Sequence, residues 1–359
     1  MPLLDKLTSF FSDPAHKRAY FWIPYNHIEN ADFTDEELTA GKHYFRLWIA
    51  EMFLDKRVDW FREWYPMAHT LVSFQFGDQN LQVPHVAGAG QLQGVGEQSL
   101  AKMISLNHQL TSLMPFNGGT VELVAGLLAM KGKDYVASVV KVMGDLSKLL
   151  VVPQLSTALG LALPIASGVQ DLLGGGSGQM RLGMHETYVG AGGTGKNVLH
   201  PGFFAVIDGN ATDYDAAEFW VKGGRLFRGA SMAASVPFED ASHMLFQVEF
   251  REKRDDWMSL KSIQDAYNEA VRQQGEGEDE KAELAIKRAI VLARTSPDLT
   301  RADRNRVALA VKEDFDQGKG GGEKAVPAGQ RNLASVMEQR GIDVEAALAE
   351  EPDWEAMLK

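Results

Sequence analysis

Residues 244–274, MLFQVEFREKRDDWMSLKSIQDAYNEAVRQQ, contain the change of pattern that decides the predicted fold. In the MLFQVEF part, Leu245, Gln247 and Glu249 alternate with aromatic and aliphatic side chains, which predicts a strand. From Trp257 onward the apolar residues recur every three or four positions, which predicts an amphipathic helix. A chain that changes once from strands to helices is typical of the α+β class.

Three amphipathic helices are predicted after this change, over 257–274, 279–295 and 300–317. Short turns rich in Gly, Pro and Ser separate them, and such turns are typical of antiparallel neighbours. We therefore expect a helical array over 257–317. The Gly- and Lys-rich segment 318–328 predicts a flexible linker, and 329–359 predicts a short tail that docks on another protein or folds back on its own domain.

Short strands separated by turn residues are predicted before the change, and we expect a mainly antiparallel sheet within a core domain over 1–256. The strands cover 70–76, 81–86, 180–189, 202–207, 217–222, 224–227 and 244–250. Residues 221–226 (VKGGRL) predict a tight hairpin, because glycine accepts the positive φ that a two-residue turn requires.

Two regions predict apolar helices that cover this sheet. In 34–64 the aromatic and aliphatic residues recur at helical spacing, and Thr34 with Glu37 matches a capping box. In 97–173 the chain is apolar on nearly every face between turn signals, which predicts a buried helical block.

The segment 149–170, LLVVPQLSTALGLALPIASGVQ, carries no charge inside an otherwise charged protein. It has the length of a membrane span, but Pro153, Pro164 and its glycines make it a poor constitutive one. We expect it to be buried in the core. The alternative is a triggered membrane-inserting, pore-forming effector in which 120–173 leaves the core. The positions that represent this segment are Leu149, Val152, Leu161 and Ile165.

Residues 190–197 (GAGGTGKN) match a phosphate-binding loop except at the last position. Asn197 replaces the hydroxyl that would bind magnesium, and Pro201 prevents a useful helix from following the loop. We therefore expect a glycine-rich loop between strands. A nucleotide-binding enzyme remains a third hypothesis, and its residues would be Gly190, Gly195 and Lys196.

No catalytic residue, cofactor or metal site is predicted. The chain has no cysteine, which excludes disulfides, thiol catalysis and zinc–thiolate sites. It has no G-x-S-x-G motif, and its histidines show no metal-ligand spacing. Those considered as ligands are scattered over different predicted elements: His85, His108, His185 and His200.

Charge and termini point to protein partners. A net charge of −12 argues against a phosphate-tracking role, so nucleic acid is not the expected partner. The first residues do not resemble a signal peptide, which predicts a cytoplasmic protein. We expect a non-catalytic interaction or assembly protein of a cytoplasmic multi-protein system, with membrane contact only after a trigger and oligomerisation left open. It would bind other proteins through the helical array and through the tail residues Leu348, Trp354 and Met357.

Overall fold

The computed structural model describes residues 17–31, 36–55, 58–59, 62–76, 79–88, 103–131, 178–194 and 197–319. These residues divide into two compact units. The first unit contains the described residues up to Ala40, with Phe45–Met114 and Gly118–Phe250; the second contains Gly41–Tyr44, Pro115–Asn117 and the residues from Arg251 onward. Antiparallel sheets precede three helices, so the predicted α+β class is confirmed.

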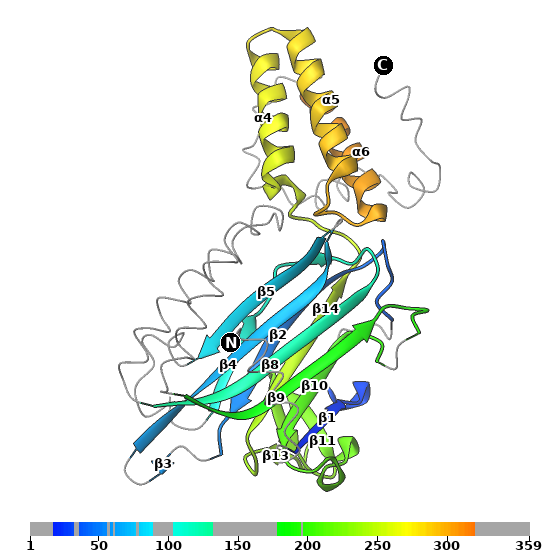
Figure 1. Cartoon of the computed structure of the whole chain (residues 1–359). Helices are drawn as coiled ribbons and strands as arrows, with labels where there is room; N and C mark the ends of the chain where they lie inside the picture. Colours follow the sequence, from blue (N-terminus) through cyan, green and yellow to red (C-terminus); the bar gives the residue numbers. More distant parts are fainter. Residues whose placement is uncertain are drawn as a thin grey trace. The chain divides into compact units, whose positions relative to one another are not determined.

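The first unit is built from three antiparallel sheets, whose strands are drawn as arrows in Figure 1. The central sheet has the order β1 (Arg18–Trp22), β10 (Gly202–Asp208), β14 (His243–Arg251), β2 (Tyr44–Phe53) and β6 (Met103–Gln109), and β2 also pairs with β7 (Met114–Pro115). The second sheet has the order β3 (Val58–Asp59), β4 (Arg62–Phe76), β8 (Thr120–Lys131) and β9 (Gly178–Val189), and β4 also pairs with β5 (Gln79–Gly88). The third sheet has the order β11 (Phe219–Lys222), β12 (Arg225–Arg228) and β13 (Val236–Pro237).

Side-chain contacts show that the central sheet is the middle layer of the first unit. On one face, the ring of Phe45 on β2 meets that of Phe74 on β4 edge to face, with 5.5 Å between their centroids. On the other face, Phe21 on β1 lies 4.9 Å from Phe219 on β11, within a buried core that the two sheets share. Strands of the central sheet are therefore buried on both sides.

The helix predicted over 34–64 is wrong, because this range contains β2, β3 and the beginning of β4. Eight of the ten side chains of β2 are buried, on both faces of the strand. A strand buried on both faces does not alternate between apolar and polar residues, so the spacing of its aromatic residues resembled that of a helix.

The helical block predicted over 97–173 is wrong wherever the structure describes it, because β6, β7 and β8 lie there. Strand β8 pairs with β4 on one side and with β9 on the other, and most of its side chains are buried. Its apolar run, like that of β2, therefore reflects burial on both faces. Residues 132–177, including the uncharged segment, lie outside the described residues.

The strands predicted over 70–76, 81–86, 180–189, 202–207, 217–222, 224–227 and 244–250 are confirmed, with β11 beginning at Phe219. The hairpin of β11 and β12 is also confirmed, since Lys222 pairs with Arg225 across a two-glycine turn. Gly223 and Gly224 have φ values of 55° and 75°, the left-handed geometry of a type I′ turn.

The second unit contains the three predicted helices, α4 (Lys261–Gly275), α5 (Asp279–Thr295) and α6 (Arg301–Lys319), shown in yellow and orange in Figure 1. Helix α5 packs against both α4 and α6. Helix α6 extends through Gly318 and Lys319, which composition had assigned to the linker. Within the described ranges, none of the helices combines the length and the apolar content that crossing a bilayer requires.

Candidate functional site

Most of the predicted site residues lie outside the described residues and stay predictions. They are Leu149, Val152, Leu161, Ile165, Gly195, Lys196, Leu348, Trp354 and Met357. Gly190 is described and directly follows β9.

The glycine-rich loop lies between two strands, β9 and β10. The amide of Gly193 donates to the carbonyl of Gly190 at 3.0 Å, and the amide of Val189 donates to the carbonyl of Asn197 at 2.9 Å. The side-chain amide of Asn197 donates to Glu186 at 2.9 Å. A phosphate-binding loop presents the amino end of a helix to its ligand, whereas the described residues that follow this loop lead into a strand.

A histidine–carboxylate pair lies on the second sheet. His185 Nε2 on β9 is 2.5 Å from Glu122 Oε1 on β8, and each side chain is about one-third exposed. A carboxylate that orients an imidazole is the usual arrangement of a general base. The pairing order of the sheet, however, places Glu122 opposite Ser73 on β4 and Thr187 on β9, and places His185 opposite Val124, so neither hydroxyl is a direct cross-strand partner of the imidazole. This order does not favour a nucleophile–base dyad.

A buried polar cluster joins the central and third sheets. Glu51 on β2 is 1% exposed and accepts a hydrogen bond from the amide of Leu226 at 2.6 Å. Its carboxylate also lies 3.5 Å from His243 Nε2 and 3.6 Å from Arg225 Nε. His243 Nδ1 lies 3.1 Å from the carbonyl of Ala241 and therefore carries the proton of that hydrogen bond. Because these groups bind one another under packed aromatic rings, we assign them a structural role.

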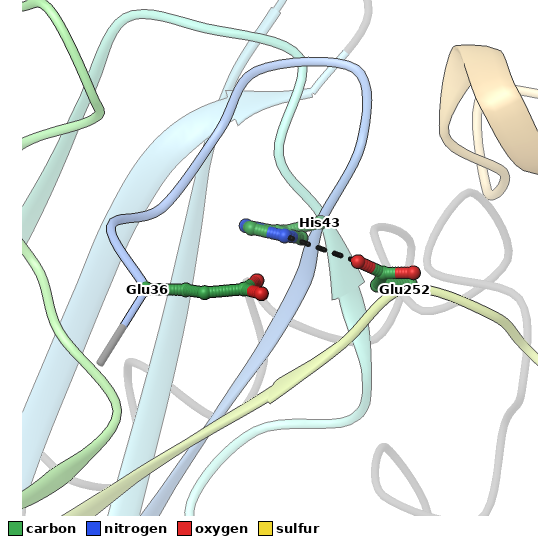
Figure 2. A group of neighbouring side chains, drawn as sticks. All are labelled: Glu36, His43 and Glu252. Atoms are coloured by element: carbon green, nitrogen blue, oxygen red, sulfur yellow. Dashed lines mark ion pairs between the residues drawn. The ribbon is translucent and has the colours of Figure 1, made fainter. Parts of the chain in front are cut away.

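Figure 2 shows a partly exposed ion pair of the second unit, between His43 and Glu252. His43 Nε2 lies 3.9 Å from Glu252 Oε1, and Lys42 Nζ lies closer to the same oxygen, at 2.8 Å. The hydrogen bond from Lys42 holds the pKa of Glu252 below its usual value. Glu36, also labelled in Figure 2, belongs to the first unit.

A second buried polar network fixes the amino end of α6. Asp303 is 2% exposed and accepts hydrogen bonds from the hydroxyl of Tyr44 at 2.8 Å and from the amide of Arg254 at 2.9 Å. The guanidinium of Arg306, which is 4% exposed, donates to the other carboxylate oxygen. Thr300 caps the helix by accepting from the Asp303 amide at 3.2 Å. The network gives the helical array a rigid base, because every group in it has a partner.

Helix α5 has two apolar stripes, of which only one is buried. The buried stripe consists of Ala282, Ile286, Ala289, Ile290 and Ala293. On another face, Leu284 is 72% exposed and Val291 is 45% exposed. These two residues are seven positions apart, which places them two turns apart on one side of the helix. Of the five large hydrophobic side chains exposed in the described part of the chain, three lie on α4 and α5, the third being Val271.

The exposed stripe of α5, Leu284 with Val291, has a basic residue in its middle and an ion pair at its flank. Arg288 lies between the two residues in the helical order, is exposed, and forms no ion pair with any described residue. Lys287 is paired with Glu283 at 3.1 Å on the flank of the stripe. Apolar side chains with an arginine among them are a composition that protein-binding surfaces favour. The exposed stripe and Arg288 are therefore the candidate functional site.

Sequence reasoning predicted α5 but missed the exposed stripe, since periodicity alone does not say which neighbours a helix has. The paired and networked residues were missed because their partners are distant in sequence. Tyr44 and Asp303 are 259 positions apart, and Glu122 and His185 are 63 positions apart. Comparison with known proteins found no matching family model, curated protein or solved structure.

Proposed function

We propose that this chain is a non-catalytic interaction protein of a cytoplasmic multi-protein system, and that it binds another protein through the exposed stripe of α5. The observation that carries the proposal is the second apolar stripe of α5, Leu284 with Val291, on a helix whose other stripe already supplies the core. A helix on the surface of a globular domain buries one apolar stripe against the core and presents polar residues elsewhere. A second apolar stripe therefore indicates a second packing partner.

The stripe contributes a modest part of the binding free energy, and Arg288 restricts which partners can bind. Burying an exposed Leu or Val side chain contributes about 1.5–3 kcal/mol, so the pair supplies only part of the free energy of a stable complex. Arg288 adds selectivity, because a partner that covers it must provide a carboxylate or leave the guanidinium desolvated and unpaired. The proposed partner therefore presents apolar side chains on both sides of an acidic one.

The test compares a Leu284→Asp/Val291→Asp double variant with a Val236→Asp control. Val236 lies on β13 of the first unit and is 63% exposed, so it matches the exposure of the stripe without belonging to it. Both variants should stay folded, with a loss of about 1 kcal/mol or less in the free energy of unfolding, because neither replaces a fully buried side chain. The double variant should lose the partners that co-purify with the tagged parent chain, and the control should keep them. Retention of all partners by the double variant would contradict the proposal.

The membrane-inserting alternative requires 120–173 to leave the core. Its first part is β8, which is paired along most of its length with both β4 and β9, so release would break two ladders of hydrogen bonds. Leakage of dye-loaded liposomes on addition of the purified chain would support that alternative. Binding of labelled ATP would support the nucleotide hypothesis, and neither response is expected from an interaction protein.

A further inference from the structure

Two histidines that the sequence places far from any common motif meet in the first unit. His85 lies on β5 of the second sheet and His108 lies on β6 of the central sheet. Their Nε2 atoms are 3.0 Å apart, and the ring centroids are 4.7 Å apart with planes inclined by 56°. The two nitrogens therefore meet between two sheets.

The backbone of β6 is distorted next to this pair. The register between β2 and β6 shifts between Ile49 and Glu51, so the strand carries a β-bulge just before His108. Asn107, within that bulge, has a φ of 38°, a left-handed conformation that non-glycine residues adopt at some cost. Bulges of this kind change the direction of the next side chain and occur near functional sites. This bulge immediately precedes the histidine that meets His85.

The separation of the two Nε2 atoms fits a shared metal ion. An imidazole binds a metal ion through the lone pair of an unprotonated ring nitrogen. His85 is 3% exposed, and His108 is half-buried. Two nitrogens on a tetrahedral zinc ion, each at a bond length of about 2.05 Å, would lie about 3.3 Å apart. The observed separation is close to that value.

A further polar group lies beside the pair. Thr70 on β4 is the direct cross-strand partner of His85 and is 0% exposed. Its hydroxyl has no hydrogen-bond partner among the described residues. An unpaired buried hydroxyl costs free energy unless something else satisfies it, and a metal-bound water is such a group.

We propose that His85 and His108 bind one divalent transition-metal ion, of the zinc class, with water in the remaining positions and the Thr70 hydroxyl facing that water. The ion would join β5 to β6 and so connect the second sheet to the central one. Imidazole nitrogen with water is a ligand set that Zn²⁺ and Co²⁺ accept, whereas Mg²⁺ and Ca²⁺ prefer oxygen ligands. This site is independent of the protein-binding stripe on α5.

The experiment uses the full chain after dialysis against EDTA. Titration with Zn²⁺ by calorimetry, and with Co²⁺ by visible absorption, should show one equivalent bound, and Zn²⁺ should raise the midpoint of thermal unfolding while Mg²⁺ does not. His85→Gln and His108→Gln should each weaken binding by about tenfold or more, because each removes one of two protein ligands. Glutamine keeps a hydrogen-bonding group in place, so far-UV circular dichroism should show these variants folded.

The control is His43→Ala, which removes the histidine beside Glu252 in the second unit and should leave the binding unchanged. If the parent chain binds neither Zn²⁺ nor Co²⁺, the contact between the two rings is a plain hydrogen bond and the proposal is wrong. The same conclusion follows if the His85 and His108 variants bind the ion as well as the parent, or if His43→Ala abolishes binding.

Discussion

Replacing Asp303 by alanine is the most informative single change in the helical unit. The carboxylate accepts from Tyr44, from the amide of Arg254 and from the guanidinium of Arg306, all of which are buried. The substitution leaves a buried cation and a buried hydroxyl without their acceptor. Removal of one partner of a buried ion pair costs about 3–5 kcal/mol, which is a large part of the 5–15 kcal/mol that stabilises a typical domain.

The assay for Asp303→Ala is urea unfolding followed by far-UV circular dichroism, which reports on α4, α5 and α6. Asp303→Asn keeps an acceptor but loses the charge, so its loss of stability should lie between those of the parent and the alanine variant. The matched control is Asp265→Ala, since Asp265 is 60% exposed and pairs only along its own helix with Lys261 at 3.0 Å. The control should change the free energy of unfolding by no more than about 0.5 kcal/mol. A loss below about 1 kcal/mol for Asp303→Ala would refute the structural role of the network.

Three further predictions concern the first unit. Burial lowers the pKa of His69 from 6.5 to about 4, so the unfolded chain binds a proton at a higher pH than the folded chain does. The free energy of unfolding should therefore fall by about 3 kcal/mol as the pH drops from about 6.5 to about 4. Urea midpoints across that range check this, and His69→Leu should flatten the profile. Gly224→Ala should lower the free energy of unfolding by about 1 kcal/mol through the positive φ alone, since a Cβ there meets no atom within 4 Å. An unchanged midpoint of thermal unfolding would contradict the turn assignment. Glu51→Ala should cost about 3 kcal/mol, because the amide of Leu226 loses its acceptor and Arg225 loses the carboxylate of its ion pair, whereas the exposed control Glu239→Ala should be neutral by the same measurement.

The sequence alone was sufficient for elements that bury one face and expose the other to water, and for a turn whose backbone geometry restricts the residue type. Helix α5 was predicted with its observed bounds because one stripe faces the array and the rest faces water, which produces helical periodicity. The turn at Gly223 and Gly224 was predicted because its left-handed backbone geometry restricts the residue type locally. Strand β14 was recognised because Gln247 and Glu249 interrupt its apolar residues at alternate positions.

The tertiary structure alone decided the strands of the middle layer and every polar site. β2 and β8 are buried on both faces, so their sequences lack the alternation that distinguishes a strand from a buried helix. The sites depend on residues distant in sequence. His85 meets His108 because β5 and β6 belong to two different sheets that pack together. Asp303 meets Tyr44 because the segment Gly41–Tyr44 belongs to the helical unit. The packing of whole faces against one another decides which strands pair and which side chains meet. Local residue patterns do not specify these partners.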